Sequence, residues 1–210
     1  MNPPTPVVFV VDDEPAIRKA VARLMRSAGY TAMTFASPQA FLDDYPQDAH
    51  GCIILDIAMP GLNGLELQQA LAESGQALPI IFLTGRGNIP MAVRAMKQGA
   101  VEVLTKPIDA DELIGAVRSA IDRDVASWKL RTAFAETQRR VATLTARERE
   151  VLEHVISGKL NKQTAAELGT VEKTIKVHRA RVMQKMNVQS LAELVRLAET
   201  AGISPVTSAV

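Results

Sequence analysis

The chain of 210 residues has room for one large domain or two small ones, and 47% hydrophobic with 22% charged residues is typical of a globular protein with ample core material. No apolar run approaches the ~18 residues that a membrane-spanning helix needs, and the amino terminus lacks the features of a secretory signal. The single cysteine, Cys52, cannot form an internal disulfide. We therefore expect a cytoplasmic protein in which Cys52 is a buried apolar residue.

The net charge of +1 hides an uneven distribution. Residues 1–125 carry 10 Lys or Arg against 15 Asp or Glu, a net charge of −5. Residues 126–210 carry 14 against 8, a net charge of +6. An acidic part joined to a basic part favours two domains with different partners.

Short apolar runs alternate with amphipathic stretches up to about residue 123. The runs, each expected to form a buried strand, are Val7–Val11, Tyr30–Phe35, Cys52–Asp56, Ile80–Thr84 and Val101–Leu104. Helical patterns lie between them, of which the clearest is the stripe Ile17, Val21, Leu24 and Ala28. This alternation predicts an α/β fold: a doubly wound, five-stranded parallel sheet (flavodoxin-like), covered by helices on both faces.

A long helix is expected over residues 109–141. Its apolar stripe begins as Leu113, Val117, Ile121, Val125 and Trp128, and then shifts to Leu130, Phe134 and Val141. No Pro or Gly interrupts the far part, which favours helix there. Beyond Trp128 the stretch turns polar and basic, so we interpret it as a linker. Whether it forms dimers or acts as a mobile tether is left open by the sequence.

From Leu144 onward the patterns are helical. Thr145–Glu148 and Ser190–Glu193 read as capping boxes that open the first and last helices of a small all-α domain. A short helix (161–168), a turn at Gly169 and a longer helix (171–186) lie between them. We expect residues 1–5 to be disordered. The predicted divisions are a first domain at 1–125, a helical linker at 126–143, the all-α domain at 144–203 and a flexible tail at 204–210.

Acidic side chains end two of the predicted strands. Asp12 and Asp13 follow the first, and Asp56 ends the third, so the three carboxylates are expected in one cleft at the edge of the sheet. Carboxylates packed together need a cation, and an all-oxygen site suits Mg²⁺. Thr84 and Lys106 lie at two more strand ends and complete a phosphoryl-binding set. In it, Asp56 is the nucleophile, and Lys106 and Thr84 bind the phosphoryl oxygens.

These motifs, over about residues 6–125, resemble a response-regulator receiver domain; they are Asp12-Asp13, Asp56 followed by Met59-Pro60-Gly61 and Gly64, Thr84-Gly85, and Lys106-Pro107. The resemblance implies that a sensor histidine kinase phosphorylates Asp56. It also implies that Asp13, Asp56 and the backbone carbonyl of Ala58 bind Mg²⁺, with Asp12 acting through water. The Lys106–Pro107 peptide bond is expected to be cis.

Two positions depart from the receiver pattern. Receivers usually carry Tyr or Phe three residues before the lysine as a reporter of phosphorylation, and here that residue is Val103. The switch at Thr84 can survive this change, whereas the aromatic swing cannot. Position 58 is a small Ala, which bears on the access of a hydrolytic water to Asp56.

The helix expected at 171–186 has two contrasting faces. At roughly 100° per residue, Val171, Ile175, Val182 and Met186 share one face. The opposite face carries Lys173, Lys176, Val177, Ala180 and Gln184. Lysines mixed with small apolar groups suit insertion into a major groove, where Lys meets guanine and Val meets thymine methyls. With the short helix before it, this segment predicts a helix-turn-helix.

Residues 144–200, which open Leu-Thr-Ala-Arg-Glu-Arg-Glu-Val-Leu, resemble the NarL/LuxR-type DNA-binding domain. The resemblance implies base contacts from Lys176 and Val177 and phosphate contacts from Lys173, Thr174 and Arg181. His178 and Arg179 are expected nearer the core. In the family the last helix, which here carries Leu191, Leu194, Val195 and Ala198, is the dimer surface, although core packing is an alternative for some of these residues.

Together the two resemblances favour a phosphorylation-controlled transcription factor similar to the FixJ-type regulators. It would bind promoter double-stranded DNA as a homodimer formed on phosphorylation, with RNA polymerase as a further partner. Activation of transcription is the commoner expectation for this architecture. The protein would be no enzyme, apart from catalysing its own aspartyl phosphorylation and dephosphorylation.

Three other classes of protein share part of this pattern. A haloacid-dehalogenase-like phosphatase needs Asp-x-Asp on the first strand, whereas this strand ends in Asp12-Asp13-Glu14. A ligand-gated, quorum-sensing regulator needs an aromatic-lined pocket, but aromatic residues make up only 4% of the chain. A receiver controlled by protein contact without phosphorylation is a further alternative, given Val103.

Overall fold

The computed structural model describes residues 5–46, 49–74, 78–85 and 89–206. The chain divides into two compact units, Met1–Lys129 and Leu130–Val210. The expected disorder at the two ends falls largely on residues 1–4 and 207–210, which lie outside the described part. Within that part, no helix combines the length and the apolar character needed to cross a membrane.

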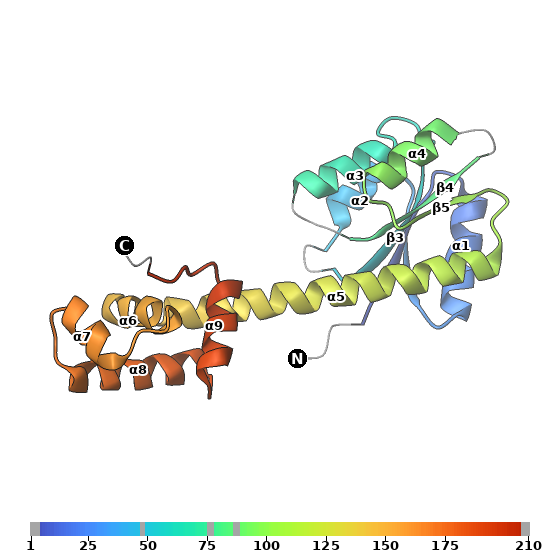
Figure 1. Ribbon diagram of the computed structural model, residues 1–210. Coiled ribbons are helices and arrows are strands. Elements are labelled where there is room, and N and C mark those ends of the chain that lie inside the picture. The colour runs from blue at the N-terminus through green and yellow to red at the C-terminus, as the bar shows by residue number, and fades with distance from the viewer. Residues whose placement is uncertain (1–4, 47–48, 75–77, 86–88, 207–210) are drawn as a thin grey trace. The chain divides into compact units, whose positions relative to one another are not determined.

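A five-stranded, all-parallel sheet forms the middle of the first unit, as the sequence predicted (Figure 1). The strands run in the order β2-β1-β3-β4-β5. Their bounds are β1 Val7–Val11, β2 Thr31–Phe35, β3 Gly51–Asp56, β4 Ile80–Thr84 and β5 Glu102–Thr105. Strands β1 and β4 match the predicted runs. The predicted fifth strand begins and ends one residue too early, because the buried Val101 precedes β5.

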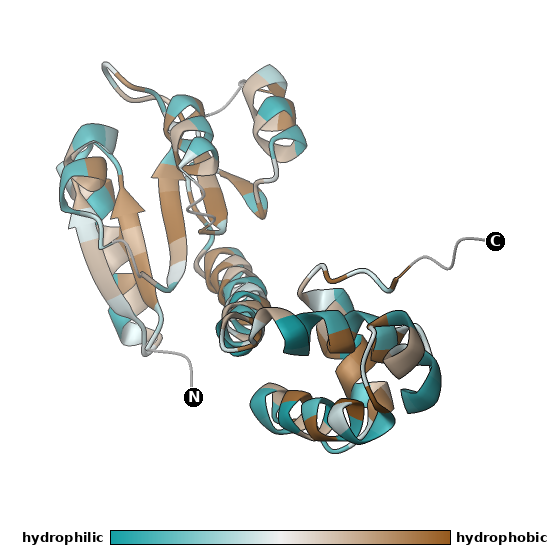
Figure 2. Cartoon of the chain, turned by 90° about the vertical axis from the view of Figure 1, so that its left-hand side faces the viewer, coloured by the Kyte–Doolittle hydropathy of each residue, from teal (hydrophilic) through white to brown (hydrophobic). Residues whose placement is uncertain are grey.

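Each face of the sheet is covered by helices, and successive strand residues feed opposite cores. Val8 and Val10 pack against α1 (Pro15–Ser27) and the first part of α5 (Ala110–Ala142). Phe9 and Val11 point to the other face, toward α2 (Pro38–Asp44), α3 (Gly64–Glu73) and α4 (Ile89–Lys97). The strands are accordingly apolar along most of their length (Figure 2).

The strand order fixes where a site can form. The chain places β2 on one side of β1 and β3 on the other, so the connections after β1 and β3 leave in opposite directions. In an open α/β sheet, ligands bind at such a switch point, beyond the carboxyl ends of the strands. Asp12 follows β1 and Asp56 ends β3, so both acids lie at this switch point.

The second unit is helical: α6 (Ala146–Ile156), α7 (Asn161–Glu167), α8 (Glu172–Met186) and α9 (Leu191–Thr200). Its core takes Leu152 from α6, Ile175 from α8 and Leu194 from α9, together with Val141 from the end of α5. The helix expected at 109–141 is thus confirmed as one continuous helix, α5. The capping box at Thr145 is also confirmed, with both reciprocal hydrogen bonds formed.

Two details of the helical unit differ from the prediction. Val171 was assigned to the buried face of α8, but it precedes the helix in an extended conformation and its side chain is 65% exposed. The helical wheel does not apply to a residue outside the helix. Ser190 caps α9 as expected, but the Glu193 carboxylate accepts from the Gln189 N–H instead of the Ser190 N–H, so the second capping box is incomplete.

Candidate functional site

Three carboxylates meet at the carboxyl edge of the sheet. Asp12, Asp13 and Asp56 each offer an oxygen, and these oxygens lie within 4.8 Å of one another. Asp12 and Asp56 are buried, whereas Asp13 reaches solvent. The structure therefore brings together the acids that the sequence assigned to one cleft.

Lys106 completes the cluster from the end of β5. Its Nζ lies 3.0 Å from Asp12 Oδ2, 3.4 Å from Asp56 Oδ2 and 3.5 Å from Glu14 Oε1. The Lys106–Pro107 peptide bond is cis, as expected. The ammonium group of Lys106 thus lies among carboxylates that follow β1 and end β3, at the same edge of the sheet.

The charges in the cleft act on one another. Burial raises the pKa of Asp56, the positive charge of Lys106 opposes this, and the negative charge of Asp12 adds to it, leaving the pKa above its usual value. Burial lowers the pKa of Lys106, but its hydrogen bond to Asp12 and the charges of Asp56 and Asp12 outweigh burial, so that pKa is raised. Lys106 therefore stays protonated beside Asp56 at neutral pH.

The donor set fits a magnesium ion. Mg²⁺ prefers a few carboxylate oxygens together with water and phosphate oxygens. One ammonium cannot neutralise three clustered carboxylates, so a divalent cation would relieve their repulsion. Ala58 lies two residues after Asp56, and its nearby backbone N–H works against the rise of the Asp56 pKa. These residues would hold the ion at the open side of the cleft, where Asp13 reaches solvent.

Thr84 ends β4 next to this cluster. Its side chain is buried, and its hydroxyl donates a weak hydrogen bond of 3.3 Å to the carbonyl of Gly85. The register pairs Asp56 with Leu83, which places Thr84 one residue further along the neighbouring strand. Val103 lies on β5 opposite Phe82 and packs partly buried against the core of that face.

Two neighbours of Asp12 were missed by sequence reasoning. Asp12 Oδ1 accepts from the Glu14 N–H at 2.8 Å, and Arg18 donates to the backbone carbonyl of Asp12. Both contacts hold the loop that presents the carboxylate. An Asp side chain often accepts from the backbone N–H two residues further on, so the sequence holds a signal for the first contact. The second depends on the direction in which α1 leaves the loop, which the sequence pattern does not encode.

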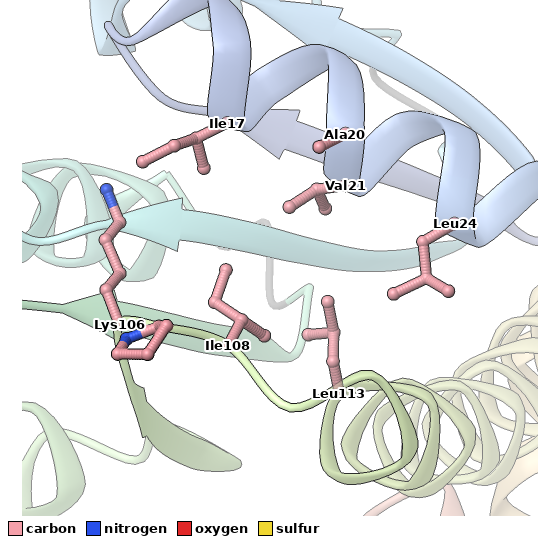
Figure 3. Close-up of a pocket in the computed structure, with 8 residues that line it drawn as sticks. Ile17, Ala20, Val21, Leu24, Lys106, Ile108 and Leu113 are labelled. Carbon is pink, nitrogen blue, oxygen red and sulfur yellow. The ribbon is translucent and has the colours of Figure 1, made fainter.

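An apolar groove of about 370 Å³ adjoins the cluster (Figure 3). Ile17, Ala20 and Leu24 from α1 line one wall. Ile108 and Leu113 line the other, and Lys106 stands at one end. A partner that approaches the acidic cleft would therefore find an apolar surface beside it.

The helix-turn-helix lies in the second unit. Gly169, with φ of 63°, turns the chain between α7 and α8. On α8 the side chains of Lys173, Lys176, Val177 and Arg181 are exposed, and Thr174 is partly buried. Lys176 forms an ion pair of 3.2 Å with Glu172, which is weak because both side chains are exposed to solvent. The opposite side of α8 buries Ile175, Val182 and Met186.

His178 and Arg179 lie nearer the core, as expected. Both are partly buried, and Arg179 Nη1 donates to Asn161 Oδ1 on α7 at 3.4 Å. At the far end of α8, Lys185 Nζ lies 2.6 Å from the Oε2 atom of the buried Glu148. The hydrogen bonds from Lys185 and from the Thr145 backbone lower the pKa of Glu148 to about 2. Polar contacts thus fix α8 to α6 and α7 while its basic face stays exposed.

Comparisons with known proteins agree with both parts of the chain. Residues 8–118 match the response regulator receiver domain family, and residues 142–198 match the luxR family of bacterial regulatory proteins. A receiver domain in the first part of the chain argues against the two other classes that the sequence had left as alternatives, a phosphatase and a ligand-gated regulator.

Several known proteins are similar to this chain over most of its length. The response regulator protein TmoT of Ectopseudomonas mendocina is 44% identical over 95% of this chain and 90% of its own length. The transcriptional regulatory protein FixJ of Azorhizobium caulinodans is 42% identical over 96% of both. The solved structure of the response regulator StyR matches with a TM-score of 0.87 at 44% identity, covering 93% of this chain and 98% of the other. The chain belongs to the two-component response regulators that join a receiver domain to a LuxR-type DNA-binding domain, and it is a transcription regulator rather than a conventional enzyme.

Proposed function

We propose that a sensor histidine kinase phosphorylates Asp56 in a Mg²⁺-dependent reaction and that this controls binding to promoter DNA. The convergence of Asp12, Asp13, Asp56 and Lys106 on one cleft carries the proposal. A carboxylate oxygen of Asp56 attacks the phosphorus, and the bond from phosphorus to the donor's imidazole nitrogen breaks, returning the electron pair to the imidazole.

Each residue of the cleft has a role in this reaction. Asp13, Asp56 and the carbonyl of Ala58 would hold Mg²⁺ directly, and Asp12 would hold it through water. The ion supplies positive charge to the phosphoryl oxygens. Lys106 binds a phosphoryl oxygen by exchanging its contact with Asp56, and its short contact with Asp12 keeps it in place. The Thr84 hydroxyl exchanges its weak bond to Gly85 for another phosphoryl oxygen.

The phosphodonor docks on the apolar groove beside Lys106. A helix of the kinase would lay its apolar residues against Ile17, Ala20 and Leu24, which brings its histidine to the end of the groove. Small phosphodonors such as acetyl phosphate need only the cleft. The two kinds of donor therefore depend on different residues.

The signal leaves the cleft through Thr84 and the adjoining β5. Val103 stands where other receivers carry an aromatic residue that changes its rotamer on phosphorylation, and it is too small to do the same. A shift of Thr84 is therefore passed to the residues of β5 through packing contacts alone. We also propose that the protein catalyses dephosphorylation of Asp56, in which a water attacks the phosphorus and the bond from phosphorus to the Asp56 oxygen breaks. The small side chain of Ala58 leaves the path of this water open.

The second unit reads promoter double-stranded DNA through α8. Lys176 and Val177 contact bases, while Lys173, Thr174 and Arg181 contact phosphates, which is consistent with the exposed face of α8. One small domain contacts few phosphates, so a homodimer formed on phosphorylation would bind paired half-sites. The DNA-bound dimer would activate transcription through RNA polymerase, in the cytoplasm, where the promoter lies.

In this scheme the receiver domain occupies residues 1–125 and the helical linker 126–143. The DNA-binding domain occupies 144–203, with a tail at 204–210. The end of α5 also supplies Val141 to the core of the DNA-binding unit, so the linker is part of its packing.

Beryllofluoride tests the proposal, because with Mg²⁺ it mimics a phosphoryl group on aspartate. Affinity for a promoter fragment obtained by binding-site selection is measured with the full chain and with Asp56→Asn. We expect tighter DNA binding and dimer formation in the wild type only. An equal response of both proteins, or none in either, would point to a receiver that works by protein contact without phosphorylation.

A further inference from the structure

The end of α5 is tied directly to the helix that reads DNA. Arg140 Nη1 donates a hydrogen bond of 3.1 Å to the backbone carbonyl of Met186, the last residue of α8. Carbonyls in the last turn of a helix lack partners within the helix, and a cation beside them is favourable. Arg140, on α5, therefore caps the carboxyl end of α8.

The guanidinium of Arg140 is held in position by its own helix. Its Nε atom lies 3.0 Å from Glu136 Oε1, one turn earlier on α5. The Arg140 side chain is 27% exposed, so the bond to Met186 is partly shielded from water. The contact with Glu136 thus orients the guanidinium of Arg140 toward the carboxyl end of α8.

A second contact runs in the opposite direction. Lys185, in the last turn of α8, donates from Nζ to the backbone carbonyl of Thr143 at 2.9 Å, just beyond the end of α5. The same ammonium pairs with Glu148 at the start of α6. Each of the two helices, α5 and α8, therefore satisfies a backbone carbonyl at the end of the other.

The remaining contacts make the last turns of α5 part of this unit. Thr137 and Val141 are buried, and Gln138 Nε2 donates to the Ala201 carbonyl at the end of α9. The first part of the same helix packs into the receiver core through Leu113 and Val117. One uninterrupted helix thus contributes to the cores of both units.

We propose that Arg140 is a positioning residue for the DNA-reading helix, and that α5 passes the state of the receiver to α8 through it. This rests on the proposed control of DNA binding by Asp56. Helix α8 has 15 residues and is about 22 Å long, so a tilt of ~10° at its anchored end moves the other end by ~4 Å. That displacement is comparable with the ~3.4 Å between stacked bases, enough to move Lys173, near the far end of α8, out of register.

The experiment compares the full-length wild type with Arg140→Ala. DNA affinity is measured with and without beryllofluoride and Mg²⁺, and the ratio of the two affinities reports the coupling. We expect Arg140→Ala to reduce this ratio by about 3-fold or more, within the range by which single substitutions alter such couplings. Arg139→Ala is the matched control: the exposed Arg139 side chain makes no hydrogen bond or ion pair among the described residues, so its ratio should equal that of the wild type.

The possible outcomes separate the two claims. If Arg140→Ala weakens DNA binding by the same factor in both states, the residue is merely structural and the coupling is overturned. If beryllofluoride leaves the affinity of the wild type unchanged, the proposed phosphorylation control fails, and the coupling with it. Should Arg140→Ala unfold the unit, Glu136→Ala removes the acceptor of Arg140 Nε and leaves the guanidinium present. A reduced ratio in that variant supports the coupling, and an unchanged ratio overturns it.

Discussion

The ammonium of Lys106 lies 3.0 Å from the Oδ2 atom of Asp12 and joins the carboxyl ends of β5 and β1, two strands at separate positions in the sheet. Asp12 is fully buried, so this contact keeps Lys106 within reach of Asp56 without consuming the Asp56 carboxylate. The cleft thereby combines the proposed nucleophile, Asp56, with a positive charge that is already in position.

Removal of that charge should slow phosphorylation. For Lys106→Ala we expect the rate of Asp56 phosphorylation by acetyl phosphate to fall by about 100-fold, the order found when one preorganised stabilising group is lost. The rate is measured by intact-mass spectrometry over time. Lys97→Ala removes an exposed lysine of α4 and should leave the rate unchanged. A Lys106→Ala protein as fast as wild type contradicts the assigned role.

The apolar groove beside Lys106 should affect phosphorylation by the kinase but not phosphorylation by a small donor such as acetyl phosphate. Ala20 is exposed and lines this groove, so Ala20→Glu places a charge on the apolar wall without disturbing the core. We expect phosphoryl transfer from the kinase to fall by about 10-fold or more, because a charge would be buried unpaired at the interface. Phosphorylation by acetyl phosphate should not change.

The matched control for the groove is Ala72→Glu, the same substitution at an exposed position of α3, on the other face of the sheet. It should affect neither donor. Equal loss with both donors in Ala20→Glu would show damage to the cleft and remove the case for a docking surface.

The Glu148–Lys185 pair gives a stability that depends on pH. The pKa of Glu148 is lowered from 4.5 to about 2 in the folded chain. A depressed pKa stabilises the fold fully above about pH 4.5, and this contribution is lost as the pH falls to about 2. Glu148→Gln should therefore lower the free energy of unfolding of the second unit by about 1–3 kcal/mol at pH 7.

Chemical denaturation from pH 7 down to pH 3 measures the effect of Glu148→Gln. The difference from wild type should shrink as the pH falls below about 4.5. Glu150→Gln alters an exposed acid of the same helix and should cost little at any pH. A constant difference across the pH range would show that the glutamine acts by packing and not by charge.

Thr164 offers a route to a more stable DNA-binding unit. Its side chain is fully buried on α7, and its hydroxyl finds no hydrogen-bond partner among the described residues. Thr164→Val keeps the shape and removes the unsatisfied group, so we expect the free energy of unfolding to rise by about 1 kcal/mol. Thermal unfolding measures this, and DNA affinity should be unchanged. A loss of stability would indicate that the hydroxyl is satisfied by a buried water.

The sequence predicted the sheet and the cleft because both depend on local patterns. Asp12 and Asp56 each come directly after an apolar run, and parallel strands end at one edge. It misplaced Val171, since periodicity cannot tell where a helix begins when the preceding residue is also apolar. Val171 gives α8 no side-chain cap, so the usual signal for a helix start is absent there.

Contacts between distant parts of the chain were beyond sequence reasoning. Asp124 on α5 is buried and accepts from the Gly51 N–H at 2.9 Å, and it faces His50 at 3.3 Å. These partners are more than 70 residues away in sequence. Neither they nor the bond from Arg140 to Met186 leaves a periodic pattern. Such contacts depend on how the finished elements pack.

The proposed control of DNA binding begins with a phosphoryl group on Asp56, accepted with the help of Mg²⁺. Intact-mass spectrometry of the full chain after incubation with acetyl phosphate measures this step, and peptide mapping after borohydride reduction of the acyl phosphate locates it. We expect one phosphoryl group on Asp56 of the wild type, none when Mg²⁺ is chelated, and none in Asp56→Asn. Phosphorylation of Asp56→Asn to the wild-type level, or an unmodified wild type with Mg²⁺ present, would show that Asp56 is not the phosphoacceptor.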